Sequence, residues 1–518
     1  MPDMGMTIGL IKALGGGVSE AEIEELKSAI TMLGGDSYSE SVSFPNDTNI
    51  DNSGVEAASQ YYVSTDYIEL DGLSALCYTG YNGSTRAVHW YDDEKTHIGM
   101  SVYLNYDTVY DLNVLSTRPT GAAFVRVCAN KGDSHPYSLT AYYGNDYNLL
   151  LLKDIVGDGI TDDTEAFQRL VNCGDPSELD NTKTIKITSP IQVRLDSVKH
   201  LNGNGVKIVV DGDFYAFTVV GSLTSNASPN SIDSNVMNYE AGAVIENFRI
   251  TSSDGESGGG IEVKKAMKLT IKNNYIYKME NGIRIYGQSR DMTIMGNSIY
   301  GMMESGLFFD VESNLHQCNI EGNIISYTMN SIYFNEPDAI ANFQITGNDI
   351  EIGTYPTGYA NAKCINIVCG SGTQQCSEMQ ICGNTIQGHS ASGNLLSFAG
   401  YSSSLTIHDV SITGNHISNV NGSAIHLENC ENFSITGNNY KSVYTVYDMD
   451  ETCGNILIIG DVGRDVSVGK IHAASTATLT NIKCKNTIFT SYDTNNIETS
   501  NITNVDVAND VPGSGVSF

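Results

Sequence analysis

A short motif, an apolar β-branched residue before a Gly-Asn pair, recurs through the second half of the chain. The copies read "IMGNSI", "IEGNII", "ITGNDI", "ICGNTI", "ITGNHI" and "ITGNNY", after a first variant "IKNNYI". Successive asparagines are 23, 26, 25, 36, 31 and 23 residues apart, at Asn274, Asn297, Asn323, Asn348, Asn384, Asn415 and Asn438. A nearly constant period with occasional insertions is typical of a solenoid whose loops grow on one side.

Each copy is followed by a second β-strand pattern, as in "GIRIYG", "GLFFDV", "SIYFNE", "CINIVC", "NLLSFA" and "AIHLEN". Alternation of side chains along a strand assigns one inward column, consisting of Ile283, Leu307, Ile332, Ile365, Leu395 and Ile425. One turn is too short to have its own core, so stacking must bury these side chains. The recurring asparagine tolerates left-handed backbone and can form a stacked amide ladder. The sequence predicts an all-β fold, a right-handed parallel β-helix over residues 149–512, followed by a tail at 513–518.

The stretch "VGDGITDDTEAFQRLV" precedes these repeats. Gly157 and Gly159 predict a tight turn, and Thr161 or Asp162 is expected to cap a short helix over residues 161–172. Asp163 then lies at a helix start, where a structural role is favoured over a catalytic one. An apolar stripe on this helix is expected to cover the first turn of the solenoid, and it consists of Ala166, Phe167, Leu170 and Val171.

This motif, followed by turns punctuated with asparagine, resembles the pectate-lyase-like β-helix superfamily, which includes phage tailspikes, pectate lyases and polygalacturonases. The resemblance covers about residues 153–510 and is specific for fold, not for chemistry. The paired motifs of polygalacturonases are absent from the repeats, where "QGHSASG" around His389 is the nearest fragment. Few arginines occur there, which disfavours a lyase with an arginine base.

The N-terminal part reads as three segments. Residues 1–35 predict a helical adaptor, because Ser19 and Glu22 form a capping box and the following apolar residues make a two-heptad seam, namely Ile23, Leu26, Ile30 and Leu33. The seam sets register in an oligomer, or the helix lies on a neighbouring domain. Residues 36–59 read as a linker, and residues 60–148 as a small antiparallel β-sandwich. "AVHWYDDEKTHIGM" and "TRPTGAAFVRV" resemble jelly-roll modules of phage tail proteins, which are taken to bind glycans. Trp90 stacks on a sugar ring or belongs to the core.

Charge and composition exclude several functions. With 28 basic and 60 acidic residues the net charge is -32, which argues against nucleic-acid binding. Only 17% of residues are charged, and the abundant small polar residues suit sugar hydroxyls. No signal peptide or membrane-spanning stretch is recognised. The eleven cysteines contain no CxxC pair, and the spacing from Cys364 to Cys382 matches no zinc site. We therefore expect free thiols in a chain folded in a reducing cytosol, with no metal and no cofactor.

Candidate site residues lie on the outward face of the second strands. Aromatic and polar groups for a sugar ring are Arg284, Tyr286, Phe308, Tyr333 and Asn335, and Leu396 and Phe398 are also assigned outward. Acids for glycoside hydrolysis, which needs two nearby carboxyl groups, are Asp310, Glu312, Glu336 and Asp338, and His426 with Glu428 forms a weaker cluster. On such an acidic chain these acids are alternatively a solvated surface, and the aromatic strip alternatively packs against another chain.

These patterns favour a phage or prophage tail protein that recognises, and in one version depolymerises, a bacterial surface polysaccharide. It would act as a homotrimer in the virion tail, assembled in the host cytoplasm, and contact other tail or baseplate proteins through its N-terminus. The alternative is a glycoside hydrolase or polysaccharide lyase of a gut bacterium, hydrolysis being favoured over elimination. The third interpretation is a shaft without catalysis.

Overall fold

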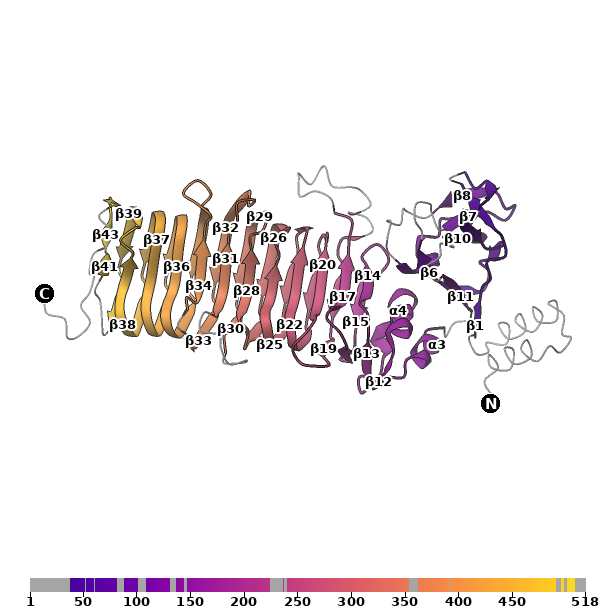
Figure 1. Cartoon of the computed structure of the whole chain (residues 1–518), viewed down its shortest axis with the longest axis horizontal. Helices are drawn as coiled ribbons and strands as arrows, with labels where there is room; N and C mark the ends of the chain where they lie inside the picture. Colours follow the sequence, from indigo (N-terminus) through magenta and orange to yellow (C-terminus); the bar gives the residue numbers. More distant parts are fainter. Residues whose placement is uncertain are drawn as a thin grey trace. The chain divides into compact units, whose positions relative to one another are not determined.

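A computed structural model describes residues 38–507, apart from gaps at 52, 60, 82–87, 101–108, 131–136, 144–146, 224–235, 237–239, 354–361, 392, 491–494 and 498–500 (Figure 1). The expected helix within residues 1–35 and the tail at 513–518 lie outside the described residues. The chain forms two compact units. One contains the residues up to Gly157 together with Asp163–Leu179, and the other contains Asp158–Asp162 and the residues from Asp180 onward.

The first unit contains two small antiparallel sheets around a common apolar core. One sheet has the order β1 (Tyr38–Ser41), β11 (Ser138–Tyr143), β6 (Leu73–Tyr81) and β9 (Val109–Asn113). The other has the order β4 (Tyr62–Ser64), β10 (Phe124–Asn130), β7 (Val88–Tyr91) and β8 (His97–Met100), with β5 (Ile68–Glu69) beside β10. A hairpin of β2 (Thr48–Ile50) and β3 (Glu56–Ala58), and the 3-10 helix η1 (Val114–Thr117), complete this part.

The segment 36–59, expected to be a linker, therefore supplies strands β1, β2 and β3. The Ser- and Asn-rich composition that indicated a linker is also compatible with short, exposed strands, and β1 pairs with β11 over four residues. Trp90 on β7 is 1% exposed and lies in the apolar core of this unit. Its indole is therefore not available to stack on a sugar, and of the two interpretations the core one is correct.

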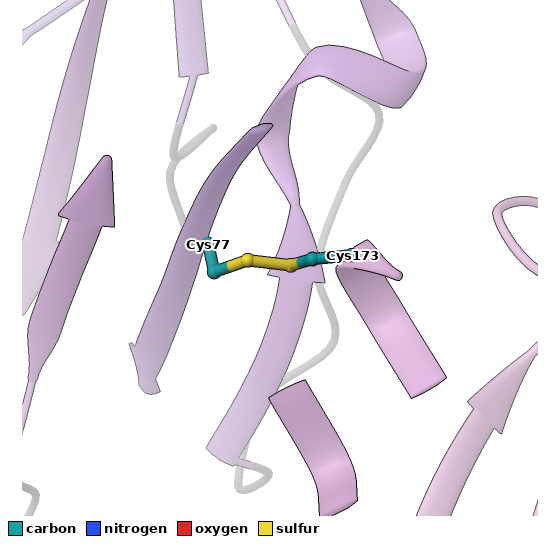
Figure 2. The surroundings of a disulfide bond; sticks show 2 residues. All are labelled: Cys77 and Cys173. Carbon is teal, nitrogen blue, oxygen red and sulfur yellow. A yellow bond between two sulfur atoms is a disulfide. The ribbon is translucent and has the colours of Figure 1, made fainter. Parts of the chain in front are cut away.

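Three helices follow these sheets, α3 (Tyr147–Asp154), α4 (Thr164–Cys173) and the 3-10 helix η2 (Pro176–Glu178). Helix α4 lies against α3, β6 and β9, and its stripe residues Phe167, Leu170 and Val171 are buried. Cys173 at its end forms a disulfide with Cys77 of β6, which ties the helix to the sheet (Figure 2). The expectation of free thiols is thus wrong for this pair, while the other nine cysteines are free. The proposed contact of α4 with the first solenoid turn stays a prediction.

The acids at the start of α4 do not cap it with their side chains. Asp163 occupies the N-cap position, but its buried carboxylate accepts hydrogen bonds from the backbone N–H groups of Val156 and Gly157, at 2.8 and 2.9 Å. Asp162 instead accepts a hydrogen bond from the Thr188 hydroxyl at 2.7 Å. Both aspartates are therefore structural, but they hold the preceding loop and the neighbouring turn rather than the helix amides.

The second unit is a solenoid of parallel strands that stack turn upon turn (Figure 1). It begins with β12 (Asp158–Asp162), which pairs with β13. The strands of the solenoid form three faces. The first face contains β13 (Thr184–Ile187), β16 (Lys207–Val210), β19 (Arg249–Ser252), β22 (Tyr275–Tyr286), β25 (Ser298–Phe309), β27 (Ile324–Ser326), β30 (Asp349–Glu351), β33 (Thr385–Ala391), β36 (His416–Thr436), β37 (Asn439–Ile459), β38 (Val462–Ala473) and β40 (Ile488–Thr490).

The other two faces are built from the strands that follow in each turn. The second contains β14 (Ile191–Arg194), β17 (Tyr215–Val220), β20 (Gly259–Lys264), β28 (Asn330–Asn335), β31 (Lys363–Val368), β34 (Leu396–Ala399) and β41 (Asn495–Ile497), with the later parts of β22, β25, β36, β37 and β38. The third contains β15 (His200–Asn202), β18 (Val244–Glu246), β21 (Thr270–Lys272), β23 (Gln288–Arg290), β24 (Thr293–Met295), β26 (Asn314–Glu321), β29 (Ala339–Thr346), β32 (Gln375–Cys382), β35 (Ile407–Thr413), β39 (Thr478–Lys485), β42 (Asn501–Thr503) and β43 (Asp506–Val507), with the ends of β36 and β37.

The inward column of the second face matches the prediction except on one turn. Ile365 of β31 pairs with Leu396 of β34, not with Leu395. Leu396 and Phe398, which the sequence assigned outward, are therefore buried, and Ser397 takes the outward position. The run "NLLSFA" contains two adjacent leucines, both fully buried, so alternation alone does not fix the register there.

The predicted asparagine ladder is confirmed. From Asn297 to Asn438, each buried asparagine accepts, through its side-chain oxygen, hydrogen bonds from the backbone N–H and side-chain amide of the asparagine one turn earlier. The backbone distances are 2.9 to 3.0 Å. The left-handed backbone belongs to the preceding glycine, with φ of 64° at Gly347 and 65° at Gly414. In the variant "IKNNYI", Asn273 takes that position with φ of 56°. The glycine thus makes the corner, and the asparagine is free to link the turns.

Candidate functional site

One line of outward side chains runs along the second face of the solenoid. We call it the outward column, and its members pair in register on successive turns: Glu262, Arg284, Phe308, Tyr333, Asn366, Ser397, His426, Asp448 and His472. Neighbouring parallel strands are ~4.8 Å apart. An extended polymer lying along this face would pass one column residue per turn, although Glu262, Asn366 and Ser397 are themselves buried.

Phe308 and Tyr333 form the aromatic part of the outward column. Their rings stack with centroids 5.6 Å apart and an interplanar angle of 27°. The Tyr333 hydroxyl donates to Asn335 Oδ1 at 2.9 Å, and burial raises the pKa of this tyrosine, so it stays protonated at neutral pH. The sequence predicted both aromatics and Asn335 as binding residues, and the structure brings them together.

A surface hollow of about 340 Å³ lies beside these rings. Its lining consists of Glu304, Ser305, Met329, Asn330, Tyr333, Lys363 and Asn366. The Lys363 ammonium donates to Asn366 Oδ1 and to Ser397 Oγ, each at 3.1 Å, and burial lowers its pKa. The Asn366 amide in turn donates to Asn330 Oδ1 at 3.3 Å. Lys363 thus connects two positions of the outward column and presents a cation to the hollow.

Two polar atoms near this hollow are buried without a partner among the described residues, Ser305 Oγ and Asn281 Oδ1. The two residues pair in register on adjacent turns, and Ser305 lines the hollow. A buried polar atom without a hydrogen bond is costly, by about 1–3 kcal/mol.

A pair of glutamates follows the same two turns. Glu280 and Glu304 lie between the register pairs Met279–Met302 and Asn281–Ser305. Burial, and then the charge of Glu304, raises the pKa of the Glu280 carboxyl. A carboxyl with a raised pKa beside a second carboxyl is the arrangement that general acid catalysis uses.

The predicted catalytic acids do not form such a pair. Asp310 is buried and bound by the Arg284 guanidinium, which also donates to Glu262 at 2.9 Å, and Asp310 accepts the Val311 N–H at 2.7 Å. The Asp310 carboxylate is thus engaged by the guanidinium and by a backbone N–H, which favours an anchoring role. Glu312 bonds to the Tyr286 hydroxyl.

The other two predicted acids follow β28, on the next turn. Glu336 is exposed, with φ of 46°, and its carboxylate lies over Gly370. Asp338 is half-buried, and its backbone carbonyl accepts the Gln374 N–H at 2.6 Å. The four acids were grouped because they lie on two adjacent turns, but each of them has different contacts.

Tyr286 lies one outward position away from the outward column. It pairs in register with Lys264, whereas Arg284 is the residue that pairs with Phe308. The Arg284 guanidinium lies 5.3 Å from the Tyr286 ring centroid. Tyr286 therefore flanks the Phe308–Tyr333 stack instead of continuing it.

His426 belongs to a larger cluster than the sequence indicated. His426 Nδ1 lies 3.0 Å from Asp448 Oδ2, and His472 Nδ1 lies 2.6 Å from Asp448 Oδ1. Burial disfavours ionisation, but these histidines hold the pKa of Asp448 below its ordinary value. Burial and the charge of Asp448 raise the pKa of Asp450. Glu428 lies on the rim, 3.9 Å from His426 Nε2.

Sequence reasoning missed Glu280, Lys363, Asp448, Asp450 and His472. The last three could have been found by continuing the period beyond the last Gly-Asn copy. Asp448 follows His426 by 22 residues and His472 follows Asp448 by 24, both near the repeat length. Glu280 carries no such signal, because its burial depends on the packing of adjacent turns.

The sequence of this chain also matches a known protein family, in agreement with the stacked strands and the asparagine ladder. The family described as "Right handed beta helix region" matches residues 196–376 and 281–462, which together span more than half of the chain. The chain belongs to the right-handed β-helix family. Comparison with curated protein sequences found no match to this β-helix protein. None of its described helices is both long and apolar enough to cross a bilayer.

Solved structures similar to this β-helix protein include three of differing activity. The catalytic unit of a GH87 α-1,3-glucanase from Streptomyces thermodiastaticus has 14% identity and a TM-score of 0.39, covering 90% of this chain and 98% of that one. The A-module of the mannuronan C-5 epimerase AlgE4 of Azotobacter vinelandii has 13% identity and a TM-score of 0.40, covering 71% and 99%. Tailspike protein 2 of Escherichia coli O157:H7 bacteriophage CAB120 has 13% identity and a TM-score of 0.40, covering 67% and 43%. The activities in these names belong to those proteins.

Proposed function

We propose that this β-helix protein binds an extended polysaccharide along the outward column. The observation that carries the proposal is the Phe308–Tyr333 stack beside a polar hollow with an unpartnered buried hydroxyl, that of Ser305. Stacked aromatic faces bind the apolar faces of sugar rings, and amide and hydroxyl groups bind their edges. Lys363 offers one local positive charge to the ligand, whereas the large negative charge of the whole chain repels a strongly anionic polymer. We therefore expect the polymer to be neutral or weakly anionic.

The biological setting that we propose is a phage or prophage tail, where the polysaccharide is a bacterial surface glycan. The resemblance of "VGDGITDDTEAFQRLV" and its following repeats to tailspikes supports this setting, as does the resemblance of the first unit to phage tail modules. In that setting the chain is a homotrimer, and its N-terminus contacts other tail proteins. A monomer mass by light scattering at micromolar concentration would overturn the trimer.

The experiment that tests binding uses a panel of capsular and cell-wall polysaccharides from candidate hosts. Purified full-length chain is mixed with each polymer, and binding is measured by isothermal titration calorimetry. New reducing ends are measured separately in the same mixtures. We expect saturable binding to one polymer class. If no polymer class binds, or if binding is equally strong to all of them, the proposal is wrong.

A second function, hydrolysis of the bound glycan, is favoured by the raised pKa of Glu280 beside Glu304. In this proposal Glu280 donates a proton to the leaving glycosidic oxygen, and Glu304 acts as nucleophile or as base for water. Both residues lie on the turns that contribute Ser305 and Phe308, so the scissile bond would lie at the edge of the aromatic stack. Binding without new reducing ends would leave the protein as a receptor-binding shaft.

A further inference from the structure

The cluster at the far end of the outward column combines an imidazole with two carboxylates. His426 comes from β36, and Asp448 and Asp450 come from the adjacent strand β37. One ligand atom from each of the three lies within 4.8 Å of the others. His426 Nδ1 and Asp448 Oδ2 are 3.0 Å apart. This spacing allows both atoms to bind one ion at about 2.0–2.2 Å.

Asp450 Oδ1 is the least satisfied atom of the cluster. The Asp450 side chain is half-buried, but this oxygen is shielded from solvent and has no hydrogen-bond partner among the described residues. A buried carboxylate oxygen without a partner is expensive, and buried charges are normally paired or coordinated to a metal. Asp448 Oδ2 faces His426 Nδ1 at 3.0 Å, so neither of these atoms donates a hydrogen bond to Asp450 Oδ1.

The neighbouring groups are placed as the outer partners of a metal site usually are. A histidine ligand commonly donates its second ring N–H to a carboxylate, which fixes the ring orientation. With Nδ1 of His426 turned to the cluster, Nε2 faces Glu428 Oε2 at 3.9 Å. His472 Nδ1 lies 2.6 Å from Asp448 Oδ1, the oxygen that does not face His426. The His472 contact therefore orients a ligand without occupying the centre, and Glu428 lies within ion-pair distance of His426.

We propose that His426, Asp448 and Asp450 bind a first-row transition-metal dication, with Zn²⁺ as the reference ion. An imidazole with two carboxylates suits Zn²⁺ or Mn²⁺, whereas Ca²⁺ and Mg²⁺ prefer six or more oxygen ligands or retained water. Three protein ligands leave a coordination position open. Ser397 precedes His426 in the outward column, so the open position adjoins the polymer path proposed above. The metal site itself does not depend on that path.

The test measures metal binding without any glycan. The full-length chain, prepared without a histidine tag and treated with chelator, is titrated with Zn²⁺ by isothermal titration calorimetry, and with Ca²⁺ in parallel. We expect one Zn²⁺ per chain with a micromolar or tighter Kd, and Ca²⁺ binding at least 100-fold weaker. Asp450→Asn and His426→Gln each should weaken Zn²⁺ binding by at least 10-fold. His472→Gln, which removes an orienting contact, should weaken it by about 10-fold.

His408→Gln provides a matched control, because His408 also lies beside a carboxylate, with Nδ1 2.8 Å from Asp409 Oδ2, but outside the cluster. It should leave Zn²⁺ binding unchanged. Thermal unfolding separates binding from folding. Asp450→Asn should not lower the melting temperature of the metal-free protein, yet it should abolish the rise that Zn²⁺ causes in the wild type. The proposal is overturned if Zn²⁺ does not bind, if the cluster variants bind like wild type, or if Ca²⁺ binds as tightly.

Discussion

Asn438 donates its backbone N–H to the carboxylate of Asp461 at 2.7 Å, and its side-chain amide to the same oxygen at 3.3 Å. Asp461 thus takes the place of an asparagine at the end of the buried ladder. Its other oxygen, Oδ2, accepts hydrogen bonds from the hydroxyl groups of Tyr440 and Tyr447. A ladder of neutral amides therefore ends on a buried, ionisable group, and its stability should depend on both parts.

The ladder should contribute measurably to folding. Asn438→Ala removes the acceptor for the backbone N–H and side-chain amide of Asn415, which are buried. We expect a loss of about 2–4 kcal/mol in the free energy of unfolding, because each buried unpaired donor costs about 1–3 kcal/mol. Asn439→Ala is the control, since Asn439 is the exposed neighbour. Equal denaturant midpoints for the two variants would show that the ladder is dispensable.

Asp461 should make stability depend on pH. Burial raises its pKa above the ordinary value of 3.8, even though it accepts several hydrogen bonds. Because the pKa of Asp461 is raised in the folded state, protonation of Asp461 favours folding. The resulting stabilisation is fully present below pH 3.8, the ordinary pKa, and is lost as pH rises through the folded-state pKa of Asp461. Asp461→Asn, neutral at every pH, should therefore melt at a higher temperature than wild type at pH 8. The difference should vanish as pH falls toward 4, and a constant difference across that range would contradict the prediction.

The disulfide between Cys77 and Cys173 should stabilise the first unit. It closes a loop with a sequence separation of 96 residues and joins β6 to α4. Cys173→Ser should cost about 2–5 kcal/mol, mostly by enlarging the unfolded ensemble. Cys382→Ser changes a free, half-buried thiol and serves as control. Calorimetry should show one transition moving to lower temperature in Cys173→Ser, and wild type with reductant should behave in the same way. Identical scans with and without reductant would refute this role.

The aromatic stack should determine glycan affinity. Phe308→Ala removes one face of the platform with Tyr333, and should weaken binding about 10-fold, which corresponds to about 1.4 kcal/mol. Tyr300→Ala is the matched control, because Tyr300 is an exposed aromatic at the start of the same strand, β25, on the first face of the solenoid. If Tyr300→Ala weakens binding and Phe308→Ala does not, the polymer lies on the first face.

Glu280 should separate binding from cleavage. If the protein hydrolyses its glycan, Glu280→Gln should reduce the rate of appearance of reducing ends at least 100-fold, because the proton donor is lost. Affinity should change less than 3-fold, since the amide retains the shape of the carboxyl. Asp310→Asn is the comparison, because the structure gives Asp310 an ion pair with Arg284 rather than a proton-transfer role. A variant Glu280→Gln that cuts like wild type would exclude this assignment.

The sequence by itself determined the architecture of the solenoid and its ladder. The Gly-Asn period specifies a turn of nearly constant length, and a backbone whose strands must pair with the next turn has few ways to stack. For this reason the sequence alone predicts the ladder from Asn274 to Asn438, which the hydrogen bonds confirm. Alternation also placed Phe308 and Tyr333 outward correctly, because their strands have a single apolar face.

Only the tertiary structure decided which acidic side chains form ion pairs and which have a shifted pKa. Arg284 neutralises Asp310, whereas Glu280 is left with a raised pKa, and nothing in their local sequence distinguishes these two acids. The two leucines of "NLLSFA" needed the neighbouring strand to fix which one faces the column. Similarly, Cys77 and Cys173 pair because the fold brings β6 and α4 together. The period of a solenoid is written locally in the chain, but the ionisation and pairing of a side chain depend on the field and burial created by the turns on either side of it.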